Sequence, residues 1–133
     1  MKIRVSSVQY HLHTIQSFEE FAHQCEHYVK AALEFDAEFI LFPEFLTTQL
    51  LSMKGANGAM LTINDLPSFT ELYRNLFSSF AKRYNVHVIG GTHVIEVNGQ
   101  LQNTAHLFYP DGQIRTQAKL HITPTEVHEW NMS

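Results

Sequence analysis

The chain has 133 residues, of which 44% are hydrophobic and 17% are charged, and its formal net charge is −4. This length suits one domain, and the composition is that of a globular chain. The acidic balance argues against binding to nucleic acid or to an anionic membrane, and no apolar run approaches the roughly 18–20 residues that span a bilayer. The single cysteine, Cys25, excludes an internal disulfide. With an N-terminus that moves directly into a strand pattern, the chain is expected in the reducing cytoplasm.

The first forty residues predict a strand, a helix and a second strand. Residues 3–9 carry the first strand pattern. Ser17 and Glu20 form a capping-box pattern, and an apolar stripe of helical period follows as far as Phe35. The four apolar residues 39–42 are typical of a strand that is buried on both faces. This order predicts a parallel strand pair with a right-handed crossover.

The next segment is predicted to be a long loop followed by a second strand–helix–strand passage. Residues 52–64 lack a sustained period and predict a long loop, which at this place after Glu44 could act as a binding loop or lid. Ser68 and Glu71 form another capping-box pattern, and the helix that follows is expected to stop at Asn85. Residues 86–91 predict a third buried strand.

The last part of the chain predicts antiparallel strands. Residues 93–97 and 101–109 flank Asn98-Gly99, which is the strongest short signal for a hairpin. A further strand is predicted over residues 113–120, and residues 121–133 are expected to be irregular. The predicted fold class is therefore α/β, a mixed β-sheet with flanking helices.

Glu44 is the first candidate for a functional residue. It follows the buried strand 39–42, and Pro43 should end the ladder because it has no N–H to donate. Ligands of open α/β sheets bind at the carboxyl edge of the strands. A carboxylate between Phe42 and Phe45 would be partly desolvated and suited to act as a general base. The alternative is a surface glutamate in a strand-to-loop turn.

Lys119 and Glu126 form the second candidate pair. Lys119 ends the last predicted strand, and Glu126 follows seven residues later in a polar segment. Taken alone, Lys119 is better explained as a surface lysine at a strand end.

Other motifs are better explained by structure than by chemistry. His23 and His27 flank a glutamate in a zinc-protease-like pattern, but they lie opposite the apolar stripe of their helix, on a solvated face. Cys25 falls inside that stripe and is expected to be a buried structural thiol. His11 and His13 are too isolated to predict a metal site. With no complete dinucleotide fingerprint and no phosphate-binding loop, we expect neither a metal nor a cofactor.

Together these features resemble the carbon–nitrogen hydrolase (nitrilase) superfamily. The motifs that carry the resemblance stand in the family's order: Val8-Gln9, Leu41-Phe42-Pro43-Glu44, Val88-Ile89-Gly90-Gly91, Asn103-Thr104-Ala105, Lys119-Leu120-His121 and Pro124-Thr125-Glu126. The resemblance implies an α-β-β-α sandwich and a catalytic set of Glu, Lys and Cys. It also implies a small-molecule amide, nitrile or carbamoyl substrate that is attacked by a thiolate.

The resemblance assigns a role to each candidate. Glu44 would be the general base that takes the thiol proton, Lys119 would stabilise the oxyanion, and Glu126 would hold the lysine ammonium in place. The family's nucleophilic cysteine follows the lysine motif, whereas no cysteine follows Lys119 and Cys25 precedes it. We therefore expect residues 1–133 to be the N-terminal part of such a hydrolase domain and to be inactive by themselves.

Two further expectations follow. Half of a sandwich leaves one sheet face uncovered, and the family tends to form dimers, so a homo-oligomer is expected.

The competing hypothesis is a non-catalytic α/β binding or assembly module. A reading frame that continues past Ser133 to a strand and a cysteine would favour the enzyme, and a stop codon there would favour the module.

Overall fold

The computed structural model describes residues 1–133 and contains a five-stranded mixed sheet in the order β1-β2-β3-β4-β5. Strands β1 to β3 pair in parallel, whereas β3, β4 and β5 pair antiparallel. The strands span Val5–Ser7 (β1), Phe39–Leu41 (β2), His87–Val97 (β3), Gln100–Phe108 (β4) and Ile114–Ala118 (β5). The mixed α/β sheet predicted from the sequence is confirmed.

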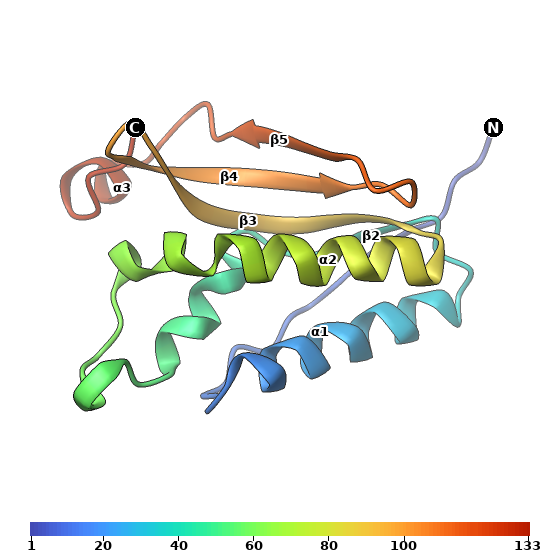
Figure 1. Cartoon of the computed structure of the whole chain (residues 1–133). Coiled ribbons are helices and arrows are strands. Elements are labelled where there is room, and N and C mark those ends of the chain that lie inside the picture. Colours follow the sequence, from blue (N-terminus) through green and yellow to red (C-terminus); the bar gives the residue numbers. More distant parts are fainter.

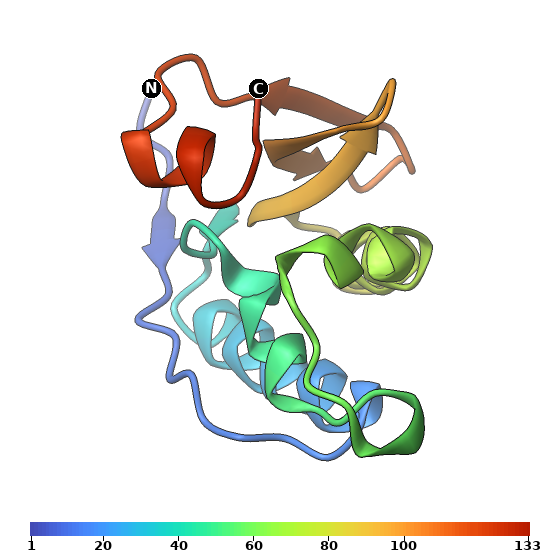
Figure 2. The same cartoon turned by 90° about the vertical axis from the view of Figure 1, so that its left-hand side faces the viewer.

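Two long helices cover one face of this sheet. They are α1 (Phe18–Leu33) and α2 (Thr70–Tyr84), and they lie side by side beneath the strands (Figures 1 and 2). The core between the helices and the sheet is rich in aromatic side chains, including Phe21, Phe42 and Phe77, which are fully buried. None of the helices combines the length and the hydropathy that crossing a membrane requires.

The helix boundaries follow from local signals that the sequence carries. Ser17 caps α1 by accepting a hydrogen bond from the backbone N–H of Glu20 at 3.3 Å. The side chain of Glu20 accepts from the backbone N–H of Gln16 instead of completing a capping box with Ser17. Asn85 ends α2 in the left-handed conformation, with a φ of 50°. Both predicted boundaries are confirmed.

The segment between β2 and α2 corrects the prediction of a long loop over 52–64. It forms the short 3₁₀ helices η1 (Leu46–Ser52), η2 (Ala56–Gly58) and η3 (Ile63–Phe69). The predicted capping box of Ser68 with Glu71 is wrong, because no side chain caps α2 at its first residue. The capping box lies earlier, between Thr62 and Asp65 at the start of η3.

Strand β3 corrects a second prediction, since the segments predicted separately over 86–91 and 93–97 form one continuous strand that begins at His87. A bulge between Ile89 and Thr92 shifts the register of its pairing with β4. Asn98 and Gly99 both have positive φ values, as their hairpin turn requires, so that turn is confirmed.

Two further predictions are wrong in detail. Residues 39–42 are not buried on both faces, because the helices cover one face only and Leu41 remains 37% exposed on the other. Residues 121–133 are not irregular. They contain the short helix α3 (Pro124–His128), and the buried Met132 then pairs with Leu101 of β4 (Figure 1). We call the sheet face opposite α1 and α2 the open face; α3 lies at one end of it.

Candidate active site

The position of Glu44 is set by the end of β2 and by the bulge in β3. After Leu41, the N–H of Phe42 still donates to Ile89 O at 2.9 Å, and Pro43 then ends the pairing. The chain passes so close to β3 here that a Cβ on Gly91 would lie 2.0 Å from the carbonyl oxygen of Pro43. Only glycine fits at residue 91, and its φ of +65° also favours glycine. Glu44 is therefore fixed at the carboxyl edge of β2.

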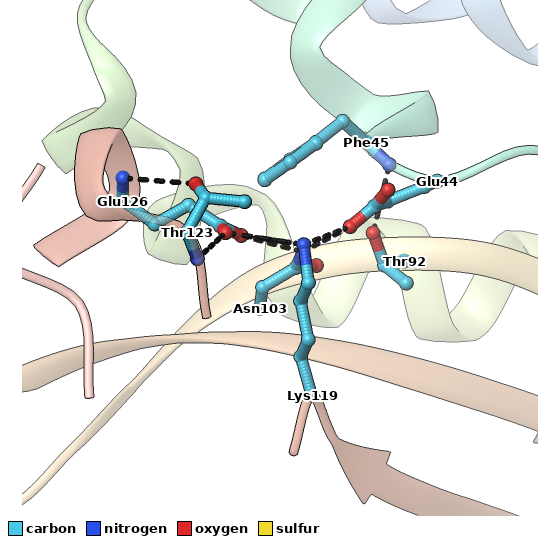
Figure 3. Close-up of polar contacts among 7 residues, drawn as sticks. All are labelled: Glu44, Phe45, Thr92, Asn103, Lys119, Thr123 and Glu126. Carbon is cyan, nitrogen blue, oxygen red and sulfur yellow. Dashed lines mark hydrogen bonds and ion pairs between the residues drawn. The ribbon is translucent and has the colours of Figure 1, made fainter. Parts of the chain in front are cut away.

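Phe45 adopts a left-handed backbone conformation directly after Glu44, with φ 57° and ψ 30°. This conformation costs a non-glycine residue roughly 1–2 kcal/mol. Two contacts offset the cost. The N–H of Phe45 donates to Thr92 Oγ1 at 2.7 Å, and its ring packs edge-on against Trp130 with centroids 5.6 Å apart. The turn leaves the carboxylate of Glu44 facing Lys119 (Figure 3).

Lys119 comes from the end of β5. Its backbone N–H donates to the carbonyl oxygen of Asn103 on β4 at 2.8 Å, one residue beyond the last strand pair. Its Nζ donates to Glu44 Oε1 at 2.8 Å and lies 3.2 and 3.1 Å from the two carboxylate oxygens of Glu126. One ammonium therefore bridges two carboxylates.

Glu126 is held by the first turn of α3. Its backbone N–H donates to Thr123 Oγ1 at 3.3 Å, and its Oε2 accepts from the backbone N–H of Thr123 at 2.7 Å. This is a complete capping box, so the carboxylate has one orientation. The side chain of Glu126 is 2% exposed, whereas that of Glu44 is 49% exposed.

The electrostatics of the site keep these groups charged. Burial raises the pKa of Glu126, but the hydrogen bonds from Thr123, Lys119 and Asn103 outweigh it and lower that pKa to about 2. The hydrogen bonds to Glu44 and then to Glu126 raise the pKa of Lys119 above its usual value. Near neutral pH, Lys119 is an ammonium and Glu126 is a carboxylate.

A cavity of about 400 Å³ lies beside this cluster on the open face of the sheet. Glu44, Asn103 and Lys119 line its polar side. Thr92 and Ala105 share that face because they pair across β3 and β4, and Gln117 pairs with Ala105 from β5. The cavity can hold a small polar molecule next to the carboxylate and the ammonium.

The structure brings together the three residues that the sequence predicted, Glu44, Lys119 and Glu126. The surface-residue alternative is met in part for Glu44, which stays half exposed in a strand-to-loop turn, but the side chains of Glu44 and Lys119 are both paired inside the cluster. The expected partial desolvation of Glu44 is met only in part, since about half of its side chain is exposed. Sequence reasoning gave no role to Asn103, which also contacts the site. Its Asn-Thr motif was the available signal.

The other candidates lie elsewhere. Cys25 is fully buried in α1, where its Sγ lies 3.7 Å from the hydroxyl of Tyr10, and burial raises its pKa. The placement of Cys25 in the core is confirmed. His23 and His27 are exposed on α1, as their helical phase predicted. The rings of His11 and His13 stack on each other in the loop before α1.

A model of the carbon–nitrogen hydrolase family matches residues 4–132, so the chain belongs to the carbon–nitrogen hydrolase family. It is also 44% identical over 131 residues to "Probable hydrolase YhcX" of Bacillus subtilis (strain 168). That alignment covers 98% of this chain and 26% of the relative, so the chain spans about a quarter of that protein.

Solved structures agree on the fold. A carbon–nitrogen hydrolase from Helicobacter pylori G27 superposes with a TM-score of 0.75 at 18% identity, covering 98% of this chain and 44% of that one. Nit3 of Saccharomyces cerevisiae, a member of the nitrilase superfamily, gives a TM-score of 0.66 at 16% identity, with 90% and 44% covered. An amidase from Nesterenkonia sp. gives 0.65 at 15% identity, with 91% and 44% covered. The chain therefore has the fold of somewhat less than half of each of these proteins.

Proposed function

We propose that this chain supplies the base and the oxyanion-binding lysine of a thiol-dependent hydrolase of non-peptide carbon–nitrogen bonds. The observation that supports the proposal best is the ammonium of Lys119 between Glu44 and Glu126, beside a cavity. In this proposal residues 1–133 are the N-terminal part of the hydrolase domain, and the nucleophilic cysteine comes from a later segment. The domain would work in the cytoplasm on a small amide, nitrile or carbamoyl compound.

In the proposed mechanism, Glu44 takes the proton of the cysteine thiol and the thiolate attacks the electrophilic carbon of the substrate. Glu44 Oε1 is occupied by Lys119 and Asn103, whereas its Oε2 forms no hydrogen bond and is the oxygen suited to accept this proton. For an amide, Lys119 donates to the oxyanion of the tetrahedral intermediate. The carbon–nitrogen bond then breaks, the amine leaves with the proton from Glu44, and water hydrolyses the thioester.

The test uses the full-length protein in which this chain continues to a cysteine. Glu44→Gln should lower turnover about 10²–10⁴-fold while leaving the fold intact, because the amide cannot accept the thiol proton. Turnover is measured as ammonia release from a panel of small amides, nitriles and carbamoyl compounds. The matched control is Glu96→Gln, an exposed glutamate far along β3, which should retain full activity. Substantial activity in Glu44→Gln would refute the assignment.

Two further points belong to the proposal. The 133-residue chain alone should release no ammonia above a Glu44→Ala control, since it offers no thiol at the site. The open face exposes Val5 and Leu41, which are 56% and 37% exposed. Either the rest of the domain or a second copy would cover this surface, so we keep homo-oligomerisation as a prediction for sedimentation measurements.

A further inference from the structure

Asn103 occupies the centre of the Glu–Lys–Glu cluster without carrying a charge. It projects from the middle of β4 onto the open face and is 1% exposed. Its Nδ2 donates to Glu44 Oε1 at 2.9 Å and to Glu126 Oε1 at 3.2 Å (Figure 3). The two N–H bonds of the amide therefore join the two carboxylates that Lys119 also joins.

The charge balance explains why a neutral donor is needed here. Two carboxylates face one ammonium, so the cluster carries an excess of one negative charge and needs more donors than Lys119 provides. Glu126 obtains a further donor from the backbone N–H of Thr123. Glu44 is bonded only to Lys119 and Asn103, although half of its side chain faces solvent. Asn103 is thus half of what holds Glu44 in place.

The orientation of the Asn103 amide has a visible cost. Its Oδ1 is buried and has no hydrogen-bond partner. Turning the amide over would place this oxygen against two carboxylate oxygens, which is worse. An unpartnered buried acceptor typically costs about 1–3 kcal/mol. The two hydrogen bonds that Nδ2 donates to the carboxylates offset this cost.

We propose that Asn103 is a positioning residue that fixes the carboxylate of Glu44, so that Oε1 stays on Lys119 and Oε2 faces the cavity. This inference rests on the proposed role of Glu44 as the base. Asn103 does not touch the reacting atoms and acts through Glu44. Without it, Glu44 keeps a single contact with Lys119 and gains freedom to swing into solvent, whereas Glu126 stays fixed by its capping box.

The first experiment uses the 133-residue chain and needs no activity. Asn103→Leu keeps the number and branching of the side-chain heavy atoms and removes both N–H donors. NMR couplings across the Glu44 side chain should change from one rotamer to an average of several. The Lys119 ammonium signal should persist, because its bonds to Glu126 remain. The matched control is Thr104→Val, the next residue on β4 and equally buried, which contacts neither carboxylate.

Should Asn103→Leu fail to fold, Asn103→Asp is the second variant, since it preserves the shape of the side chain and replaces the N–H donors with an acceptor oxygen. It adds a like charge beside the two carboxylates, so Glu44 should again lose its single rotamer. A fixed Glu44 rotamer in a folded Asn103 variant, with only the stability lowered, would overturn the proposal in favour of a purely structural role.

The second experiment measures kinetics in the full-length protein. Asn103→Leu should lower kcat by about 10–100-fold with little change in KM, because the base is displaced while the other residues that line the cavity stay in place. Thr104→Val should change neither constant. An inactive wild-type protein would refute the proposed function, whereas the NMR measurement of the Glu44 rotamer would still stand. If Asn103→Leu leaves kcat unchanged although Glu44 becomes mobile, the positioning role is refuted and the proposed function is not.

Discussion

The two faces of the β3–β4 pair hold polar groups in opposite ways. On the open face, Asn103 meets the charged side chains of Glu44, Lys119 and Glu126. On the face towards α2, the same two strands present His93 and His106, which we call the imidazole pair. Adjacent residues of β4 point to opposite faces, so the two regions are separated only by the backbone of the sheet.

The imidazole pair is satisfied without charge. His93 is fully buried, and its Nδ1 and Nε2 each lie 2.8 Å from a hydroxyl, of Thr47 and Thr70 respectively. His106 Nδ1 lies 3.0 Å from Thr104 O, and its Nε2 accepts from Nε of Arg74 at 3.2 Å. This pattern fits the neutral tautomer of His106 with the proton on Nδ1.

Burial is the main cause of the low pKa values of the pair. For His93, burial and then the proximity of His106 and Arg74 lower the pKa to about 3. For His106, burial lowers the pKa to about 4, against a backbone hydrogen bond to Thr104 that raises it. The comparison shows that this fold keeps charge where opposite charge and hydrogen-bond donors surround it, as at Glu126, and keeps the two histidines under α2 neutral.

The largest effect should come from acid, because it breaks the imidazole pair first. Both histidines have folded-state pKa values below the ordinary value of 6.5, so the unfolded chain binds more protons between that pH and about 4. Their contribution to the free energy of unfolding is fully present above pH 6.5 and is lost as the pH falls below that value. Below pH 6.5, each histidine should lower the free energy of unfolding by about 1.4 kcal/mol per pH unit. For the pair, the loss at pH 5 should be about 4 kcal/mol.

Urea unfolding at several pH values measures this slope. Glu126 adds to the loss only as the pH falls below its ordinary value of 4.5, so the range from 4.5 to 6.5 isolates the imidazole pair. His93→Gln should roughly halve the slope in that range, at the cost of a lower stability at neutral pH. His23→Gln, on the exposed face of α1, should leave the slope unchanged. A flat profile in the wild-type chain would contradict the neutral burial of the pair.

The second effect concerns the charged region. Lys119→Met should lower the free energy of unfolding by about 3 kcal/mol, because Glu126 would remain buried without its cation. The control is Arg83→Met, which removes a surface ion pair with Glu26 and should cost less than about 1 kcal/mol. Urea midpoints at unchanged m-values compare the two variants. Equal losses would mean that the buried carboxylate does not depend on Lys119.

Much of this contrast was predictable from sequence periodicity and motif order. The strand-end position of Glu44 follows from the apolar run 39–42 that stops at Pro43, and that of Lys119 from the alternating segment 114–119 that ends before a polar loop. Glu126 was placed by resemblance alone. The capping box of Thr123 and Glu126 is itself a sequence signal for α3, but a helix of five residues is too short for its periodicity to be recognised.

The roles of the buried polar residues were harder to predict. The two-residue turn at Asn98-Gly99 sets the register that pairs His93 with Thr104, so their shared face could have been derived. The bulge before Thr92 and the coverage of each face depend on tertiary packing and carry no periodic signal. The double donation by Asn103 depends on two carboxylates from distant segments, which no local pattern reveals.

The smallest effect is an expected absence of change, and it tests whether the two faces act independently. Cys25 lies in α1, on the side of the sheet away from Glu44, and burial raises the pKa of its thiol. A thiol reagent should therefore react slowly and only through opening of the fold, at a rate that urea accelerates. Glu44→Ala should leave this rate unchanged once stability is matched. Fast labelling that Glu44→Ala abolishes would place Cys25 within reach of Glu44 and make it a candidate nucleophile, which its position in α1 argues against.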